Sequence, residues 1–106
     1  MEIFKTNLLN GVTVDFKEQH KVALISCIEV VLMSRGNTKY NLVVCKLNSL
    51  YNCSIRDCCE NPEYLKAVLK EVYKEDYNSI IEEIKSHLDD LIKEKDISDF
   101  LQIMEN

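Results

Sequence analysis

Residues 22–33, VALISCIEVVLM, decide the fold of this chain of 106 residues. Only Ser26 and Glu29 among these twelve residues are not apolar, so a helix here has no broad polar face. Such a helix is expected to be covered on most sides, by its own chain or by a partner. Burial of its ten apolar side chains would contribute about 15–30 kcal/mol as an upper bound. We therefore expect this segment to form the centre of the core.

The composition favours a single helical domain. The chain is 46% hydrophobic and 29% charged, and it contains two glycines, one proline and no tryptophan. A β-sandwich or β-barrel needs a turn about every 8–12 residues, and this chain has too few turn-forming residues for that. We expect an all-α fold, a compact bundle of four to five helices, in which residues 17–106 form one domain.

The N-terminal residues 1–16 have a different pattern. Asn10-Gly11 lies between two apolar runs, and the second run alternates at Val12, Val14 and Phe16. Asn-Gly is a strong hairpin signal because both residues tolerate positive φ. A lone two-stranded hairpin is only marginally stable in water. This segment is therefore expected to be either a short β-hairpin or an extended arm.

Two helices are expected around the core stretch. The first covers residues 16–34 and ends at Arg35-Gly36-Asn37, where glycine suits a left-handed cap. The second covers residues 38–52, with Asn37 or Thr38 as its N-cap. The apolar stripe that this second helix should bury consists of Tyr40, Val43, Val44, Leu47, Leu50 and Tyr51.

Residues 53–60 are expected to be irregular, with Ser54 and Asp57 capping a single helical turn. Asn61-Pro62 then predicts a third helix over residues 62–73, followed by a corner at residues 74–76. A fourth helix is predicted over residues 77–94, and a short fifth helix should follow an N-cap at Asp96 or Ser98. The stripe of the fourth helix consists of Tyr77, Ile80, Ile81, Ile84, Leu88, Leu91 and Ile92.

Charge is distributed unevenly along the chain. Residues 1–50 carry six basic and four acidic side chains, a balance of +2, and residues 51–106 carry seven basic and fourteen acidic ones, a balance of −7. The net charge of −5 disfavours a general nucleic-acid binder. The apolar run at residues 22–33 is too short for a membrane span. We therefore expect a cytoplasmic protein with no membrane contact.

Five cysteines are present, and their number bears on redox state and metal binding. They are Cys27, Cys45, Cys53, Cys58 and Cys59. The odd count and the lack of a secretion signal favour free thiols in a reducing compartment. No C-x2-C pair is present, so a zinc site is not expected. A thiol-based redox sensor at Cys58 or Cys59 remains an alternative, because Arg56 could lower the pKa of a nearby thiol.

The sequence contains no pattern typical of an enzyme. There is no glycine-rich phosphate loop, no G-x-S-x-G and no paired acidic motif with a nucleophile. His20, just before the core stretch, is most simply read as a surface histidine. We expect no catalytic residues, no cofactor and no metal.

Residues 35–88 resemble a known family in their linear pattern. A helix ending in LNSLYNCSIRDC is followed directly by ENPEYLKAVLKEVYKEDYNSIIEEIKSHL. This order is similar to that of small archaeal helical signalling modules, the Nitrosopumilus output domain family. The chain departs from the family at residues 74–77, KEDY, where the family has a glycine-containing turn. The matching positions are Tyr51, Asn52, Ser54, Asp57, Glu60, Asn61, Pro62, Glu63, Leu69, Tyr73, Ile80, Ile81 and Glu82.

The resemblance implies a non-catalytic output or protein-interaction domain in archaeal signal transduction. A protein partner or a homodimer is the expected form of that interaction. If the core helix is partly exposed in a monomer, the contact residues should be Ile25, Ile28, Val31 and Leu32. The alternatives are a DNA-binding module associated with transcription and the thiol-based sensor.

Overall fold

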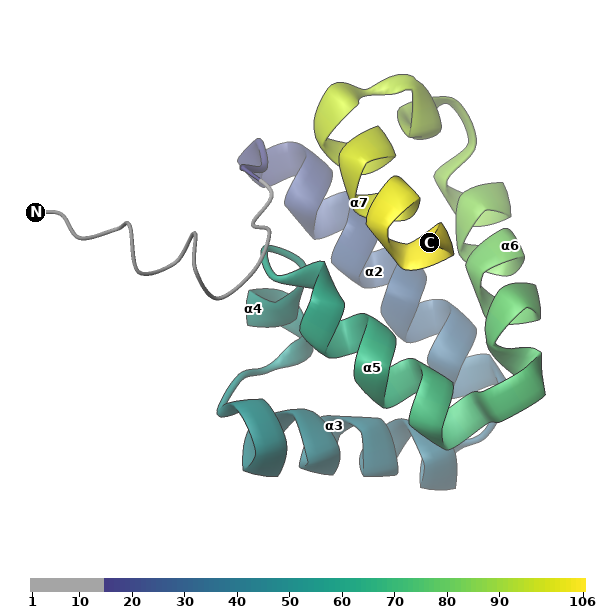
Figure 1. Ribbon diagram of the computed structural model, residues 1–106. Helices are drawn as coiled ribbons and strands as arrows, with labels where there is room; N and C mark the ends of the chain where they lie inside the picture. Colours follow the sequence, from purple (N-terminus) through teal and green to yellow (C-terminus); the bar gives the residue numbers. More distant parts are fainter. Residues whose placement is uncertain (1–14) are drawn as a thin grey trace, which may run out of the picture.

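The computed structural model describes residues 15–106, and the helices expected from the sequence are present there (Figure 1). They are α2 (Glu18–Ser34), α3 (Asn37–Tyr51), α4 (Ile55–Cys58), α5 (Pro62–Tyr73), α6 (Tyr77–Leu88) and α7 (Lys95–Glu105), with 3-10 turns η1 (Lys74–Asp76) and η2 (Asp89–Lys93). The prediction of an all-α bundle is confirmed for this part of the chain. The predicted hairpin or arm around Asn10-Gly11 lies outside the described residues.

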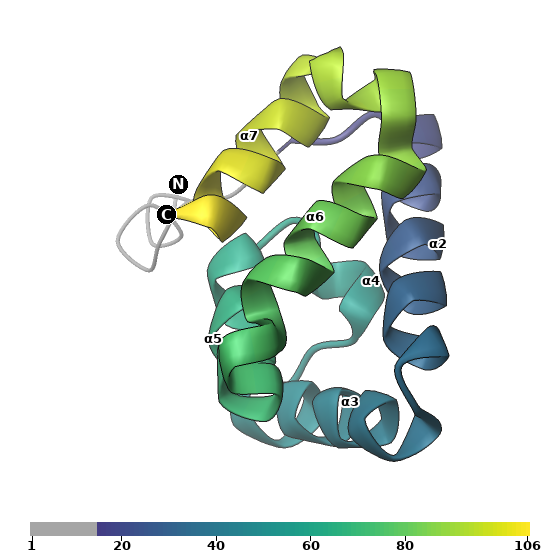
Figure 2. The ribbon, with the colours of Figure 1, turned by 90° about the vertical axis from the view of Figure 1, so that its right-hand side faces the viewer.

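The helices enclose one core. Figures 1 and 2 show α2 on one side, α5 and α7 on the opposite side, α6 closing the gap between them, and α3 crossing one end. Leu24 and Ile28 from α2 are fully buried with Leu65 from α5 and Phe100 from α7. Phe16 packs edge-to-face on Phe100 with ring centroids 6.2 Å apart, which ties the start of the described chain to α7.

Helix α2 is covered on one side only. Its buried residues are Leu24, Ile25, Ile28, Val31 and Leu32. Val22, Val30 and Met33 are 46%, 53% and 47% exposed. Of the two coverings expected for this helix, its own chain or a partner, the chain itself supplies only one face. The physical reason is the architecture, since α2 lies at the edge of the bundle and neighbouring helices pack on one face of it.

Helix α3 buries fewer residues than its apolar stripe predicts. Val43 and Leu47 are fully buried, whereas Val44 is 38% and Leu50 is 58% exposed. A helix that crosses the end of a bundle contacts it along a narrow line, so the margins of the stripe face solvent. The predicted N-cap at Asn37 or Thr38 is also wrong, because the cap is Gly36, which has φ 118.

The connections confirm some expectations and correct others. Ser54 and Asp57 form the predicted capping box before α4, and η1 forms the predicted corner. The fourth helix is shorter than predicted, since α6 ends at Leu88 and Asp89 takes a left-handed φ of 53. The following turn η2 brings α7 back onto the core, and it leaves Ile92 exposed.

Candidate functional site

The predicted contact residues on α2 point inward. Ile25 is 6% exposed, and Ile28, Val31 and Leu32 are fully buried. The condition of partial exposure is not met, so these four residues are not available for contact on the folded chain. They pack against the bundle because they occupy the inner face of α2, and the outer face carries Val22, Val30 and Met33 instead.

Exposed apolar side chains concentrate on two helices. Of the seven large hydrophobic residues that are exposed in the described chain, six lie on α2 or α3 and one, Ile92, lies in η2. We define the α3 face as the exposed residues of α3 that follow Tyr40, which lie around the sides of the helix that the bundle leaves uncovered: Asn41, Leu42, Val44, Cys45, Asn48, Ser49 and Leu50. None of the side chains of the α3 face is charged, a composition typical of the centre of a protein interface.

The α3 face is bordered by one basic residue that is already paired. The Nζ of Lys46 lies 2.9 Å from a carboxylate oxygen of Glu71 on α5. At the other end of the helix, Lys39 lies over the ring of Tyr73, 5.5 Å from its centroid. Glu71 therefore offsets the charge of Lys46, whereas Lys39 is exposed and keeps a positive charge at the N-terminal end of the α3 face.

A second candidate region is a cavity of about 360 Å³ where α2 begins and α7 begins. Asp96 accepts hydrogen bonds there from the backbone N–H of Lys17, 3.0 Å, and from the Nδ1 of His20, 2.9 Å. An ionised carboxylate can only accept, so Nδ1 of His20 carries the hydrogen. The rest of the described lining is charged, with Asp15, Glu94, Lys95 and Asp99. The hydrogen bond between His20 and Asp96 joins α2 to α7.

Asp96 is a buried carboxylate that the sequence pattern did not identify. It was expected as an N-cap, but α7 already begins at Lys95. Burial alone would raise the pKa of Asp96, but hydrogen bonds from the N–H of Lys17, from His20 and from the N–H of Ile97 together lower it. No local signal could reveal this role, because His20 and Asp96 are 76 residues apart.

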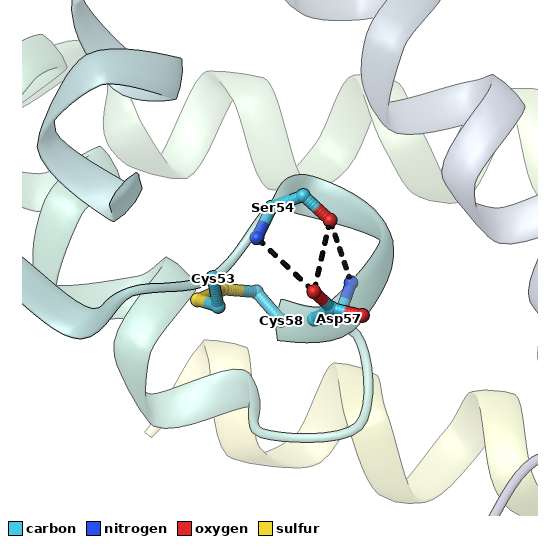
Figure 3. Close-up of a disulfide and its surroundings, with 4 residues drawn as sticks. All are labelled: Cys53, Ser54, Asp57 and Cys58. Atoms are coloured by element: carbon cyan, nitrogen blue, oxygen red, sulfur yellow. Dashed lines mark hydrogen bonds between the residues drawn. A yellow bond between two sulfur atoms is a disulfide. The ribbon is translucent and has the colours of Figure 1, made fainter. Parts of the chain in front are cut away.

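The cysteines are not all free thiols. Cys53 and Cys58 form a disulfide beside the Ser54–Asp57 capping box (Figure 3), whereas Cys27, Cys45 and Cys59 are free. The prediction of free thiols is therefore wrong for this pair. The reason is conformational, because the single turn α4 brings the two Cα atoms to 6.3 Å, within the range that a disulfide can span.

The two thiols proposed as redox sensors are inaccessible. Cys58 is fully buried and paired, and Cys59 is fully buried. Burial raises the pKa of Cys59 to about 12, and the opposing charge of Lys21 does not offset this. A reactive thiol needs a substantial thiolate fraction and access to solvent, which neither residue has in this structure.

Both arginines of the chain are engaged by acidic side chains. Arg35 donates to Glu83 at 2.8 Å and also to the hydroxyl of Ser79 at 2.9 Å. Arg56 lies 3.7 Å from Glu18. Arg35 belongs to the basic half of the chain and Arg56 to the acidic half, and in both cases an acidic side chain lies beside the cation that a phosphate contact would need.

Three further properties bear on function: the ability to span a membrane, the ability to hold a metal ion, and similarity to known proteins. None of the helices between residues 15 and 106 is both long and apolar enough to cross a membrane. Within the same residues, no three histidine, cysteine or acidic side chains gather closely enough to hold a metal ion. Comparisons with protein-family models, curated proteins and solved structures find no match to this chain.

Proposed function

We propose that this chain is a non-catalytic interaction domain that self-associates through the α3 face. The observation that carries the proposal is the composition of this face, where Leu42, Val44 and Leu50 are exposed among uncharged neighbours. Two copies can meet here without desolvating a charge, which is the main cost of bringing polar surfaces together. The same two-fold contact would bury the apolar side chains of both copies.

The size of α3 sets a limit on such a contact. A helix of 15 residues is about 22 Å long. A stable interface buries about 1,200–2,000 Å² in total, more than one helix face usually supplies. Val30 and Met33 are also exposed, on α2 shortly before the turn that leads into α3, and we propose that they take part in the same contact. The combined surface is suited to a dimer of modest affinity.

We also propose that this domain is the output module of a signal-transduction pathway, as the resemblance of residues 35–88 to archaeal output domains implies. Such a domain works by presenting a surface rather than a reactive group. A reversible dimer would let a change in local concentration or in an attached module control that surface.

The proposal is tested by measuring molar mass by light scattering during size-exclusion chromatography, in wild-type protein and two variants. Leu42→Glu places a charge on the α3 face, and Ile92→Glu places the same charge on the exposed apolar residue outside α2 and α3. Wild type and Ile92→Glu should form a concentration-dependent dimer, and Leu42→Glu should remain a monomer with an unchanged helical circular dichroism spectrum.

Two results would contradict the proposal. A wild-type chain that is monomeric at every concentration would remove self-association altogether. A dimer that persists in Leu42→Glu but is lost in Ile92→Glu would move the contact from the α3 face to η2.

A further inference from the structure

The Cys53–Cys58 bridge connects two segments whose positions are also fixed by hydrogen bonds. At the end of α3, Asn52 takes a left-handed φ of 53, and the N–H of Cys53 donates to the carbonyl of Leu47, 3.3 Å away. In α4, the N–H of Cys58 donates to the carbonyl of Ser54, 2.9 Å away. The backbone around the bridge therefore has partners of its own, and opening the bridge leaves them in place.

The two sulfur atoms differ in access. Cys58 is fully buried in the core, whereas Cys53 is half-buried. Cys53 also lines a cavity of about 290 Å³, open to solvent, between the end of α3 and α4. The remaining lining residues are Val44, Asn48, Asn52, Ser54 and Asp57. Because Cys58 is fully buried and does not line this cavity, a molecule that enters the cavity meets Cys53 rather than Cys58.

The free cysteines of the described chain are poorly placed to attack this bridge. Cys59 follows Cys58 directly, but burial raises its pKa to about 12, so it holds little of the thiolate that performs exchange. Cys45 is exposed on α3, and it precedes Cys53 by eight positions, which corresponds to about 12 Å along a helix. Cys27 is the third free cysteine, and burial raises the pKa of its thiol as well. The attacking thiol therefore comes from outside the chain.

The charge of the cavity selects among such thiols. Asp57 is the only charged residue in its described lining, and its carboxylate accepts from the hydroxyl of Ser54, 3.2 Å, in the capping box shown in Figure 3. The neighbouring Arg56 lines the adjoining cavity, which shares Val44 and Ser54 with this one. Its charge is offset by Glu18, 3.7 Å away. A negative charge beside the entrance repels an anionic thiol and attracts a cationic one.

We propose that the Cys53–Cys58 bridge is a thiol-exchange site that takes small cationic or neutral thiols. The thiolate of the incoming molecule attacks the sulfur of Cys53 and forms a mixed disulfide with it. The bond between the two cysteine sulfurs breaks, its electron pair leaves with Cys58, and Cys58 takes up a proton from solvent. In the reverse reaction Cys58 loses its proton to solvent and its thiolate attacks the sulfur of Cys53. The mixed disulfide bond breaks, the small thiol leaves as a thiolate, and the bridge is restored.

The test uses dilute oxidised full-length protein, so that self-association plays no part, with reduced cysteamine as the cationic thiol and reduced glutathione as the anionic one. Samples are quenched in acid and analysed by intact mass and peptide mapping, and rates are divided by thiolate concentration. Reduced thiols add only to a disulfide, so adducts report on the bridge. A Cys45→Ser variant removes the exposed thiol that could attack a second molecule.

We expect one adduct per chain, on Cys53, and an exchange rate with cysteamine at least about threefold higher than with glutathione. Asp57→Asn should bring the two rates closer together. Glu75→Gln, which changes the net charge equally but lies in η1, should leave their ratio unchanged. Circular dichroism before and after exchange should be the same, because the helices do not depend on the bridge.

Three results would overturn the proposal. The first is an adduct on Cys58 rather than Cys53. The second is an equal response of the rate ratio to Asp57→Asn and Glu75→Gln. The third is the absence of exchange in the native protein, either because no bridge forms on oxidation or because the bridge reacts only in denaturant.

Discussion

Helices α6 and α2 use their apolar residues in opposite ways. All apolar and aromatic residues of α6 are at most 4% exposed, and they are Tyr77, Ile80, Ile81, Ile84 and Leu88. On α2, Val22, Val30 and Met33 are each about half exposed. The bundle needs all the apolar surface of α6 for its core, but it leaves part of that of α2 and α3 unused. Surface that the fold does not use is available for contacts with another molecule.

The largest expected effect tests this difference directly. Ile84→Ala on α6 should lower the free energy of unfolding by about 2–5 kcal/mol, because it leaves a cavity in a close-packed core. Val30→Ala on α2 should change it by less than about 0.5 kcal/mol, since that side chain is 53% exposed. Urea denaturation of both variants measures the two values. Similar losses in both would mean that the outer face of α2 is covered in solution.

A smaller effect is expected where α7 is held to the N-terminus of α2. Asp96 of α7 binds the N-terminus of α2, so Asp96→Asn should cost about 1.5–3 kcal/mol at pH 7, the usual value for hydrogen bonds to a charged group. The matched control is Asp99→Asn on the same helix, where the carboxylate forms an exposed pair with Lys95 worth at most about 1 kcal/mol.

The Asp96 contact also predicts a pH dependence. Its pKa is lower in the folded chain than its ordinary value of 3.8, so the folded state favours the ionised form. The resulting stability is fully present above that ordinary value and is lost as pH falls through the lower folded value. Denaturation series from pH 7 to about pH 2 should show this loss in wild type and not in Asp96→Asn. Identical pH profiles would show that Asp96 is not the group responsible.

The smallest effect separates two buried tyrosines. The hydroxyl of Tyr77 donates to the carbonyl of Met104, 2.6 Å away, whereas the buried hydroxyl of Tyr73 has no partner among the described residues. Tyr77→Phe leaves that carbonyl unpaired and should cost about 1–3 kcal/mol. Tyr73→Phe removes an unpaired group and should be neutral or stabilising, as judged by thermal unfolding. Equal losses in both variants would indicate a partner for Tyr73 in solution.

The local structure of this chain follows from short-range signals. The Ser54–Asp57 capping box and the start of α5 at Pro62 are both present where the spacing predicts them. The clean stripe of α6 also predicts its buried residues, because every apolar side chain lies on one face. These features depend on neighbours within four residues, so the sequence contains all the information that they need.

The sequence predicted the candidate sites less well than the local structure. Apolar periodicity predicted that Leu50 is buried, but it is 58% exposed. The apolar stripe of a helix does not reveal how much of it neighbouring helices will cover. The odd cysteine count favoured free thiols, yet the turn at α4 brings Cys53 and Cys58 together. The Asp96 contact joins residues that are far apart in the chain, and no local pattern encodes it.

The sequence alone therefore determined the helical class of this protein, the approximate starts of its main helices and the inner face of α6. Those properties come from propensity, capping and periodicity, which act over a few residues. The tertiary structure decided which side of α2 is covered, how few residues of α3 are buried, and which cysteine of the bridge lines a cavity. These depend on how helices pack against one another, and packing is set by the whole set of contacts rather than by any one segment.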